Sequence, residues 1–549
     1  MTNKLFYGDN LDVLRTSVAD ESVDLVYLDP PFNSNASYNV LFKAPSGAQS
    51  QAQIEAFDDT WHWNEAAERA FDEVLTGRRS EAAMMLRAMR SALGENDMMA
   101  YLAMMAARLI ELHRVLKPTG SLYLHCDPTA SHYLKILLDS IFEARQFLSE
   151  VIWKRTSSHS SAQRWGPVHD TIFCYSKTSD YKWNSVFTTY GHSYVEKFYS
   201  HSDEKGNFAI DNLTFAGRRG GDSGKPWRGV NPDGKGRHWA VPLNLLHRLG
   251  LGGKVEHLST QEKLDFLDAN GLIYWPPKGG VPRLKRYLDF QKGVAIQDVI
   301  ADIDPISSQA QERLGYPTQK PLALLERIIS ASSNENDLVL DPFCGCGTAV
   351  HAAQKLNRQW IGVDITHLAI ALIERRLKAA FPGIAYEVHG VPKDADAARD
   401  LAARDKHEFQ KWIVATIEGQ PYRGGKKGMD RGIDGYLHFR DADNKPQLAI
   451  ISVKGGGIKS GDIRDLKGAM EREGAALGLF LTLKEPTREM EREAASAGLY
   501  ETGGRKFSRL QILTAEQVIE GKRPAVPFGF TESLKKAFRE ADDRQGKLL

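Results

Sequence analysis

A segment around residue 350 constrains the fold of this chain more than any other. The apolar run 337–340 leads into the glycine-containing stretch 341–348, a helical pattern covers 349–356, and a second apolar run over 359–363 ends on Asp364. Strand, glycine turn, helix and strand in this order form the repeating unit of a parallel α/β sheet. The segment therefore predicts an α/β domain with crossover helices.

Two further apolar runs extend the same pattern. The run 22–28 is rich in β-branched residues and ends abruptly in Asp29-Pro30-Pro31. The run 121–125 follows a helical pattern over 98–116 and a turn over 117–120. Strands that alternate with helices favour a doubly wound, parallel sheet.

Composition narrows the class of protein. A chain of 549 residues is too long for one ordinary core, so two to four domains are expected. The net charge of +1 means that any nucleic-acid surface must come from local clusters of Lys and Arg. Four cysteines cannot form a disulfide framework in so long a chain, which favours a reducing compartment. The N-terminus is unlike a secretory signal, and no run approaches the ~18 apolar residues of a membrane span. We expect a soluble protein of the cytoplasm.

Changes in amino-acid composition and hydrophobic periodicity along the chain predict the domain boundaries. Residues 180–304 are rich in glycine, aromatic and basic residues with weak periodicity, which is typical of a loop-rich insertion. Residues 392–406 consist largely of Ala, Asp, Lys and Arg, as in a charged linker, helical or flexible. The predicted order is listed from the N-terminus: a first catalytic part (1–179), an inserted recognition domain (180–304), a second catalytic part (305–391), the linker (392–406), a C-terminal domain (407–525) and a tail (526–549).

The glycine turn resembles a nucleotide-binding turn. Gly345 and Gly347 follow a strand and precede a helix, where glycines let the backbone approach a ligand. Val350 stands where a dinucleotide fingerprint has its third glycine, so nothing here demands a pyrophosphate. Asp364, at the end of the next strand, is placed to accept hydrogen bonds from ribose hydroxyls. The alternative is an ordinary tight turn. A metal site at Cys344 and Cys346 is disfavoured, because no matching Cys/His pair exists elsewhere.

Asp29-Pro30-Pro31-Phe32 carries a more specific chemistry. The carboxylate of Asp29 and the main-chain carbonyl of Pro30 can accept hydrogen bonds from an aromatic amino group, which aims the nitrogen lone pair at a methyl donor. Pro30 and Pro31 stiffen the loop so that both acceptors stay aligned. Phe32 offers a flat face on which a base rotated out of the helix can stack. The alternative is a simple proline turn after a strand.

With these motifs the chain resembles the amino-group DNA methyltransferases of the circularly permuted class called beta. In that class the catalytic motif precedes the cofactor motif and the recognition domain lies between them, as Asp29–Phe32 precede Asp341–Thr348 here. Other segments similar to the family are 7–12, 122–127, 168–177 and 316–321. The resemblance covers about residues 1–380. It implies a Rossmann-like fold that binds S-adenosylmethionine.

The resemblance also implies roles for individual residues. Asp9 and Asn10 would hold the adenine part of S-adenosylmethionine. Thr318 and Lys320 would lie beside its methionine carboxylate, although Thr318 is also a plausible helix cap. The remaining implied cofactor residues are Asp341, Phe343, Gly345, Gly347, Thr348 and Asp364, and the implied catalytic residues are Asp29, Pro30, Pro31 and Phe32.

The implied substrate is adenine N6 in double-stranded DNA, for restriction-modification or epigenetic marking. Asp at position 29 favours adenine, because the related cytosine-N4 enzymes commonly carry Ser-Pro-Pro. Cytosine N4 is the first alternative; an RNA or protein methyltransferase is the second, and the large insertion argues against it. The enzyme would act on DNA in the cytoplasm of a prokaryote or for a phage. Whether it forms a homodimer is left open.

The insertion offers a candidate DNA surface. Basic side chains can neutralise phosphates, and Trp or His can stack where a base leaves the duplex. Each such residue could equally be a solvated charge or a core aromatic, so their density is the argument. The candidates are 153–155, 164–165, Arg218, Arg219, 225–228, Lys235 and 237–239.

The C-terminal domain resembles the Mrr-like branch of the restriction endonuclease fold. Asp434 would be the first acid that binds Mg²⁺, Lys454 would orient water, and Glu408 would support them from the preceding helix. Ser452 stands where the family carries Glu, Asp or Gln. Three alternatives stay open: a neighbour such as Asp462 compensates, the domain only holds DNA, or Asp434 and Lys454 are an ordinary turn cap and strand-end charge.

Overall fold

The structure is a computed structural model that describes residues 2–31, 37–40, 54–58, 63–77, 79–156, 163, 165–290, 293–307, 310–314, 316, 318–422, 432–443 and 445–527. The chain divides into two compact units, of which the first contains Met1–Asn184 with Gln297–Leu549 and the second contains Ser185–Ile296. Among the described residues, no helix is long and apolar enough to cross a membrane.

The first unit is built on a nine-stranded sheet. All neighbouring strands run parallel except β7, which pairs antiparallel with β5 and β6. The α/β prediction is thus confirmed, with one antiparallel strand added. In spatial order the strands are β16 (Val299–Ile300), β6 (Phe147–Lys154), β7 (His169–Ser176), β5 (Leu116–Cys126), β2 (Val23–Leu28), β17 (Leu338–Asp341), β18 (Gln359–Asp364), β1 (Asn3–Tyr7) and β19 (Tyr386–His389).

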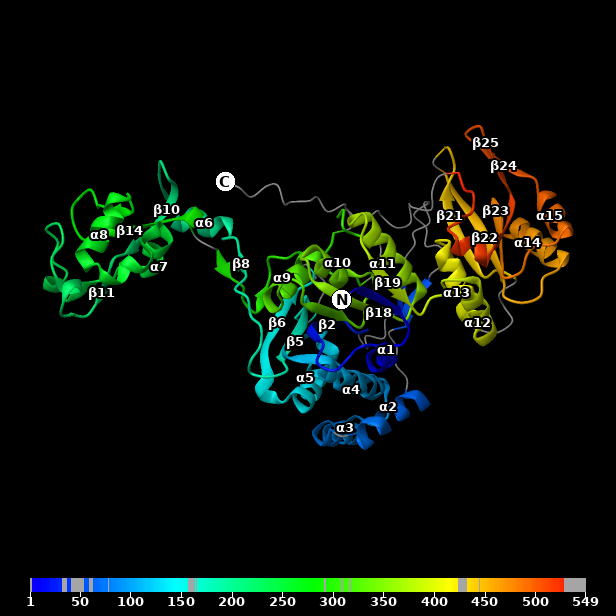
Figure 1. Cartoon of the computed structure of the whole chain (residues 1–549), viewed down its shortest axis with the longest axis horizontal. Helices are drawn as coiled ribbons and strands as arrows, with labels where there is room; N and C mark the ends of the chain where they lie inside the picture. The colour runs from blue at the N-terminus through cyan, green and yellow to red at the C-terminus, as the bar shows by residue number, and fades with distance from the viewer. Residues whose placement is uncertain are drawn as a thin grey trace. The chain divides into compact units, whose positions relative to one another are not determined.

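Helices cover both faces of this sheet, as Figure 1 shows. Along β2, Val26 and Leu28 belong to one hydrophobic cluster and Leu25 and Tyr27 to the other, because successive side chains point to opposite faces. The first cluster includes residues of α1 (Asn10–Ser17), α2 (Glu65–Thr76), α3 (Ser80–Leu93), α4 (Asp97–Val115) and α5 (Pro128–Phe142). The second includes residues of α9 (Leu322–Ser332), α10 (Thr348–Lys355) and α11 (His367–Ala380).

Two local features differ from the expectation. The turn expected over 117–120 is a bulge within β5: Leu116 pairs with Val23 and Ser121 with Leu25, so the four residues 117–120 lie opposite the single residue Asp24. In addition, the segment after the Asp-Pro-Pro motif contains an antiparallel hairpin, β3 (Ser37–Val40) with β4 (Ile54–Asp58), that the sequence patterns did not predict.

The strand order places the two sequence motifs together. β1, β2, β17 and β18 are parallel and contiguous in the sheet. Their carboxyl ends, at Tyr7, Leu28, Asp341 and Asp364, therefore lie at one edge. Ligands of open α/β sheets bind in the crevice outside this edge.

The second unit has a core of its own. Its four-stranded sheet is antiparallel, and twelve buried residues, Trp227, Trp239 and Leu264 among them, form one cluster. Its first and last strands pair with each other, Thr188 opposite Val294. Its elements are β8 (Phe187–Thr188), α6 (His192–Phe198), β9 (His201–Asp203), β10 (Gly206–Asn212), β11 (Thr214–Ala216), β12 (Arg237–Trp239), α7 (Leu243–Leu246), α8 (Thr260–Ala269), β13 (Ile273–Tyr274), β14 (Arg283–Tyr287) and β15 (Val294–Ala295).

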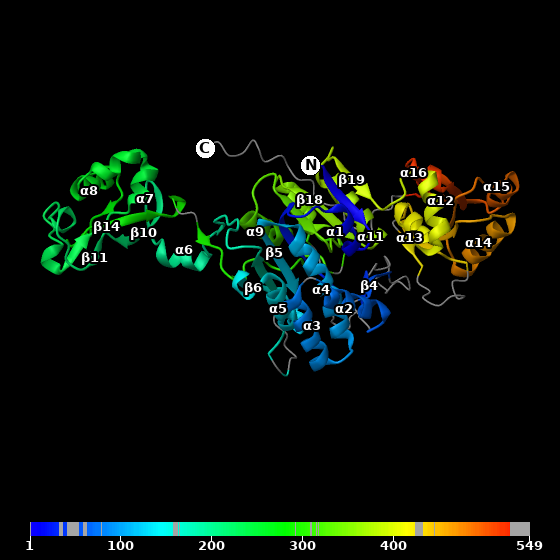
Figure 2. The same cartoon turned by 60° about the horizontal axis from the view of Figure 1, so that its bottom comes forward.

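The C-terminal part is a second, smaller α/β domain. The stretch expected to be a linker forms helix α12 (Ala395–Arg404), which lies beside α13 (Lys406–Thr416) in Figure 2, and Ala398, Leu401 and Ala402 are buried in the C-terminal core. The sheet consists of β20 (Gln420–Pro421), β21 (Gly435–Arg440), β22 (Pro446–Lys454), β23 (Leu477–Thr482) and β26 (Leu510–Thr514). The other elements are α14 (Ser460–Glu473), α15 (Arg488–Ala495), the hairpin β24 (Leu499–Thr502) with β25 (Arg505–Ser508), and α16 (Ala515–Ile519).

Candidate active site

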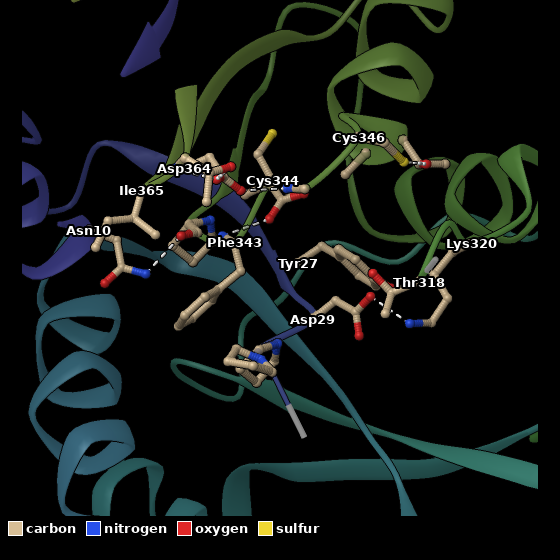
Figure 3. Close-up of a pocket in the computed structure, with 18 of the residues that line it drawn as sticks. Asn10, Tyr27, Asp29, Thr318, Lys320, Phe343, Cys344, Cys346, Asp364 and Ile365 are labelled. Atoms are coloured by element: carbon tan, nitrogen blue, oxygen red, sulfur yellow. Dashed lines mark hydrogen bonds and ion pairs between the residues drawn. The ribbon is translucent and has the colours of Figure 1, made fainter. Parts of the chain in front are cut away.

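One pocket at the carboxyl edge of the large sheet brings both motifs together (Figure 3). It is lined by residues from four strand ends and from the loop before α9. The residues of the sequence prediction that line it are Asp9, Asn10, Asp29, Pro30, Pro31, Thr318, Lys320, Asp341, Phe343, Gly345, Thr348 and Asp364. Gly347 caps α10 beside them. Phe32 lies outside the described residues.

The glycine loop has a conformation that only glycine adopts readily. Gly345 has a φ of 51° and Gly347 a φ of 73°. A Cβ on Gly347 would lie 2.8 Å from a side-chain carbon of Ile373. The loop closes on itself through a hydrogen bond of 2.7 Å from the Gly347 amide to the Cys344 carbonyl. These contacts shape a narrow backbone cradle at the start of α10.

Two carboxyl groups, Asp341 buried and Asp364 half-buried, face the pocket from neighbouring strands. Burial raises the pKa of Asp341 to about 8, with the charges of Asp29 and Asp364 acting in the same direction. Burial also raises the pKa of Asp364 to about 6, although the amides of Thr366 and Gly345 donate to it and oppose the rise. A cation in the pocket would relieve both carboxyl groups of this electrostatic cost.

Arg108 fixes the loop after β1, and Asn10 joins that loop to the one after β17. Its guanidinium donates to both carboxylate oxygens of Asp9, at 2.9 and 3.0 Å, and to the side-chain oxygen of Asn10 at 2.6 Å. Asn10 in turn donates to the Pro342 carbonyl at 2.7 Å. Asp9 also caps α1 by accepting from the Leu11 amide. Asp9 and Asn10 are therefore fixed by protein contacts as well as placed at the pocket.

The Asp29 carboxylate forms an ion pair within the pocket. Lys320 Nζ donates to Asp29 Oδ2 at 2.5 Å, and Figure 3 shows the two side chains pointing toward each other. The family resemblance implied that Lys320 lies beside the cofactor carboxylate. In the structure Lys320 contacts Asp29, and its place beside the cofactor carboxylate stays a prediction.

A buried polar cluster supports this end of the pocket. Tyr27, two residues before Asp29, places its hydroxyl 3.0 Å from His125 Nδ1, and His125 Nε2 lies 3.1 Å from Asp170 Oδ2. Burial raises the pKa of the Asp170 carboxyl, but the hydrogen bond and charge of His125, with the charges of Lys320 and Arg155, outweigh it, so that pKa lies below its ordinary value. The cluster holds the end of β2 against β5 and β7.

Sequence patterns did not identify Arg108, Tyr27 or His125. Arg108 lies in a helix whose apolar periodicity predicts only a core element, and nothing in its local spacing marks it. Tyr27 and His125 belong to apolar strand patterns. The single available signal was polarity: a His at the end of an otherwise apolar strand needs a hydrogen-bond partner.

The candidate DNA-contacting residues divide into exposed and structural ones. Trp227 and Trp239 are buried in the core of the second unit, and Trp153 is buried in the large sheet, where its indole donates to the Ile303 carbonyl. Arg228 forms ion pairs with Asp265 and Asp268. By contrast, Trp165 is 99% exposed. The hydrophobic core of the insertion thus accounts for part of its Trp content.

The acidic candidates of the C-terminal domain are occupied by protein contacts. Asp434 accepts from the Val453 amide at 2.6 Å and from Gln410 at 3.0 Å. Lys454 Nζ lies 3.8 Å from Asp462 Oδ1, and Ser452 is buried. No group of three or more His, Cys, Asp or Glu side chains that could hold a metal occurs within the described part of the chain.

Glu408, expected to support a nuclease site, contacts the methyl-transfer domain. It accepts a hydrogen bond from the Tyr7 hydroxyl, and the Tyr7 ring stacks on His367 with centroids 3.7 Å apart. Tyr7 ends β1 and His367 begins α11. Glu408 therefore contacts a residue that adjoins the loop carrying Asp9, and that residue stacks on one that follows the loop carrying Asp364.

Comparisons with known proteins match two separate parts of the chain to two different families. A family model described as DNA methylase matches residues 23–375, and one described as NACHT-associated inactive Restriction Endonuclease 1 matches residues 406–520. The type II methyltransferase M.EcaI of Enterobacter cloacae is 31% identical over 412 residues, which are 74% of this chain and 77% of that protein. The Mod subunit of the type III restriction-modification enzyme StyLTI of Salmonella typhimurium is 27% identical over 65% of this chain and 50% of its own length. The solved PvuII DNA methyltransferase, which is cytosine-N4-specific, aligns with 68% of this chain and 86% of its own at 14% identity, with a TM-score of 0.32.

The methylase match covers more than half of the chain, and it includes the Asp29 motif, the inserted unit and the glycine loop. The protein belongs to the N6/N4 family of DNA methylases.

Proposed function

We propose that this DNA methyltransferase transfers a methyl group from S-adenosylmethionine to adenine N6 in double-stranded DNA. The observation that carries the proposal is one pocket lined both by Asp29-Pro30-Pro31 and by the glycine loop with Asp341 and Asp364. A base amino group and a cationic methyl donor can meet only where these two sets of groups adjoin.

The donor set of the pocket fits S-adenosylmethionine. The ligand carries an ammonium and a sulfonium. Asp341 and Asp364 are carboxyl groups whose pKa values are raised, and a positive charge beside them would stabilise their ionised forms. The backbone cradle at Gly345 and Gly347 admits a ligand close to the main chain. Phe343 adds an aromatic wall. When bound, S-adenosylmethionine supplies an electrophilic methyl group on its sulfonium.

The chain's own groups orient the base. The Asp29 carboxylate and the Pro30 carbonyl are acceptors for the two protons of an exocyclic amino group, which directs the nitrogen lone pair into the pocket. Pro30 and Pro31 restrict the backbone that carries both acceptors. Because the lone pair of this amine is delocalised into the ring, such orientation is the chemical contribution that the enzyme must make.

Adenine is preferred over cytosine because the motif begins with Asp. The order of the two motifs supports membership in the permuted beta class. The names of the relatives, a type II methyltransferase and a type III Mod subunit, support a role in restriction-modification.

The test is methyl transfer by the purified protein to unmethylated duplex DNA, with nucleosides analysed by mass spectrometry. We expect N6-methyladenine. N4-methylcytosine alone would establish the runner-up substrate, and label found only in protein or RNA would overturn the DNA assignment. Asp29→Ala should abolish transfer and leave the affinity for S-adenosylmethionine within about threefold, because this residue acts on the base.

For the C-terminal domain we infer a role in holding DNA without cleavage. The contacts of Asp434 with Val453 and Gln410 favour this role over a Mg²⁺ site, since the carboxylate already accepts hydrogen bonds from β22 and α13. The matched family model describes an inactive endonuclease domain. Kinship to the Mrr-like branch in particular stays a prediction.

A further inference from the structure

The ion pair between Asp29 and Lys320 connects two loops that lie 291 residues apart in the sequence. Asp29 directly follows β2, and Lys320 lies in the loop that precedes α9. Lys320 Nζ approaches only one carboxylate oxygen of Asp29, Oδ2, at 2.5 Å (Figure 3). The contact thus distinguishes the two oxygens of the group that we assign to the base.

The loop that carries Lys320 is fixed by its own hydrogen bonds. The Gln319 side chain accepts from the Leu314 amide at 2.8 Å and donates to the Glu312 carbonyl at 2.6 Å. The Glu312 carboxylate accepts from the Leu322 amide at 3.0 Å. Lys320 itself is only 9% exposed. The backbone around Lys320 is therefore fixed by these hydrogen bonds, and its side chain is largely enclosed, unlike that of a surface lysine.

Lys320 also acts electrostatically on the carboxyl groups around it. Burial raises the pKa of Asp341, and the charge of Lys320 opposes this rise. The same charge contributes to the lowered pKa of Asp170. The ammonium thus acts on Asp29, Asp341 and Asp170 at once, at the point where the base site and the donor site adjoin.

We propose that Lys320 is a positioning residue for the Asp29 carboxylate: it holds Oδ2 and leaves Oδ1 to accept a hydrogen bond from the base's amino group. The inference rests on the proposed function of Asp29. It differs from the role implied by the family resemblance, in which Lys320 binds the methionine carboxylate of the donor. The two roles predict opposite effects on donor affinity and on turnover.

The experiment compares Lys320→Met, which keeps the length but removes the charge, with Lys320→Arg, which keeps the charge. Calorimetry measures the Kd for S-adenosylmethionine without DNA, and initial rates on saturating unmethylated plasmid give kcat. For Lys320→Met we expect kcat to fall by about 100-fold, as when a group that orients charge is removed, and the Kd to change by less than about threefold. Lys320→Arg should recover part of kcat.

Lys117→Met is the matched control, because Lys117 pairs with Asp24 at 2.7 Å in the same sheet and does not line the pocket. It should keep kcat and Kd near those of the wild type. A rise of about tenfold or more in Kd for Lys320→Met, with kcat preserved, would assign Lys320 to the donor and overturn the proposal. An increase in kcat would show that the ion pair blocks the site and would overturn it as well. A wild-type protein that transfers no methyl group would instead refute the proposed function itself.

Discussion

The Asp364 carboxylate accepts a hydrogen bond from the Gly345 amide at 2.8 Å, so the end of β18 holds the glycine loop that follows β17. Asp364→Ala should weaken binding of S-adenosylmethionine by about 10- to 100-fold, since hydrogen bonds to charged groups contribute about 1.5–3 kcal/mol. Calorimetry on the purified variant measures this. Glu387→Ala removes an exposed carboxylate from β19 and should bind normally; an equal loss in both variants would show that the effect is not local to the loop.

The buried Asp341 predicts an unusual dependence of stability on pH. Its pKa is raised by burial from an ordinary 3.8 to about 8, so the folded protein keeps a proton that the unfolded chain loses. This contribution to stability is fully present below about pH 4 and is lost as the pH rises toward about 8. Asp341→Asn removes this titrating group. Between about pH 5 and pH 8 the Tm of the ligand-free variant should therefore fall less than the Tm of the wild type. Identical slopes for wild type and variant would contradict the assignment.

The ionisation of Asp341 also predicts how donor binding depends on pH. A cationic ligand favours the charged carboxylate, so S-adenosylmethionine should bind more tightly at about pH 8 than at about pH 6 and should release protons on binding near neutrality. Calorimetry in two buffers of different ionisation enthalpy detects the released protons. Proton uptake would mean that the group that titrates is a different one.

The glycine loop allows a matched test of backbone and packing effects. Gly347 and Gly383 both have positive φ, but a Cβ at Gly347 would lie 2.8 Å from Ile373, whereas a Cβ at Gly383 meets open space. Gly383→Ala should cost about 1 kcal/mol from backbone conformation alone, and Gly347→Ala about 1–3 kcal/mol more from crowding. Urea unfolding gives both values. Equal destabilisation by the two substitutions would show that the Ile373 side chain moves aside without a cost in free energy.

The C-terminal domain should not cut DNA. We expect no nicking or cleavage of methylated or unmethylated plasmid with Mg²⁺ or Mn²⁺. Asp434→Ala should lower the free energy of unfolding by about 1–3 kcal/mol, because it leaves the Val453 amide without its acceptor. Cleavage by the wild type that Asp434→Ala abolishes would restore the nuclease hypothesis, and cleavage that survives Asp434→Ala would point to another site.

Much of the large sheet follows from local sequence patterns. The apolar runs at 22–28, 337–340 and 359–363 correspond to β2, β17 and β18, and the helical run 98–116 corresponds to α4. Each of these segments is bounded by residues that end it physically, such as the two prolines after Asp29. The linker prediction for 392–406 missed that Ala398, Leu401 and Ala402 share one helix face at spacings of three and four, which buries them in the core.

The contacts that complete the pocket could not be predicted in the same way. Lys320 meets Asp29 across 291 residues of sequence, and which loops adjoin at the edge of a sheet depends on strand order, a tertiary property that periodicity does not specify. Arg108 reaches Asp9 across helix packing, and its helix pattern is equally compatible with a solvent-facing arginine. The motifs predicted most of the residues that line the pocket, while the electrostatics of the pocket depend on these long-range partners.

β8 and β15, the first and last strands of Ser185–Ile296, pair with each other, so the two ends of this unit lie side by side. Replacement of this segment as a block would leave every hydrogen bond of the nine-stranded sheet in place. Exchange of this segment for another whose ends pair in the same way should therefore leave the folding of the large sheet unchanged.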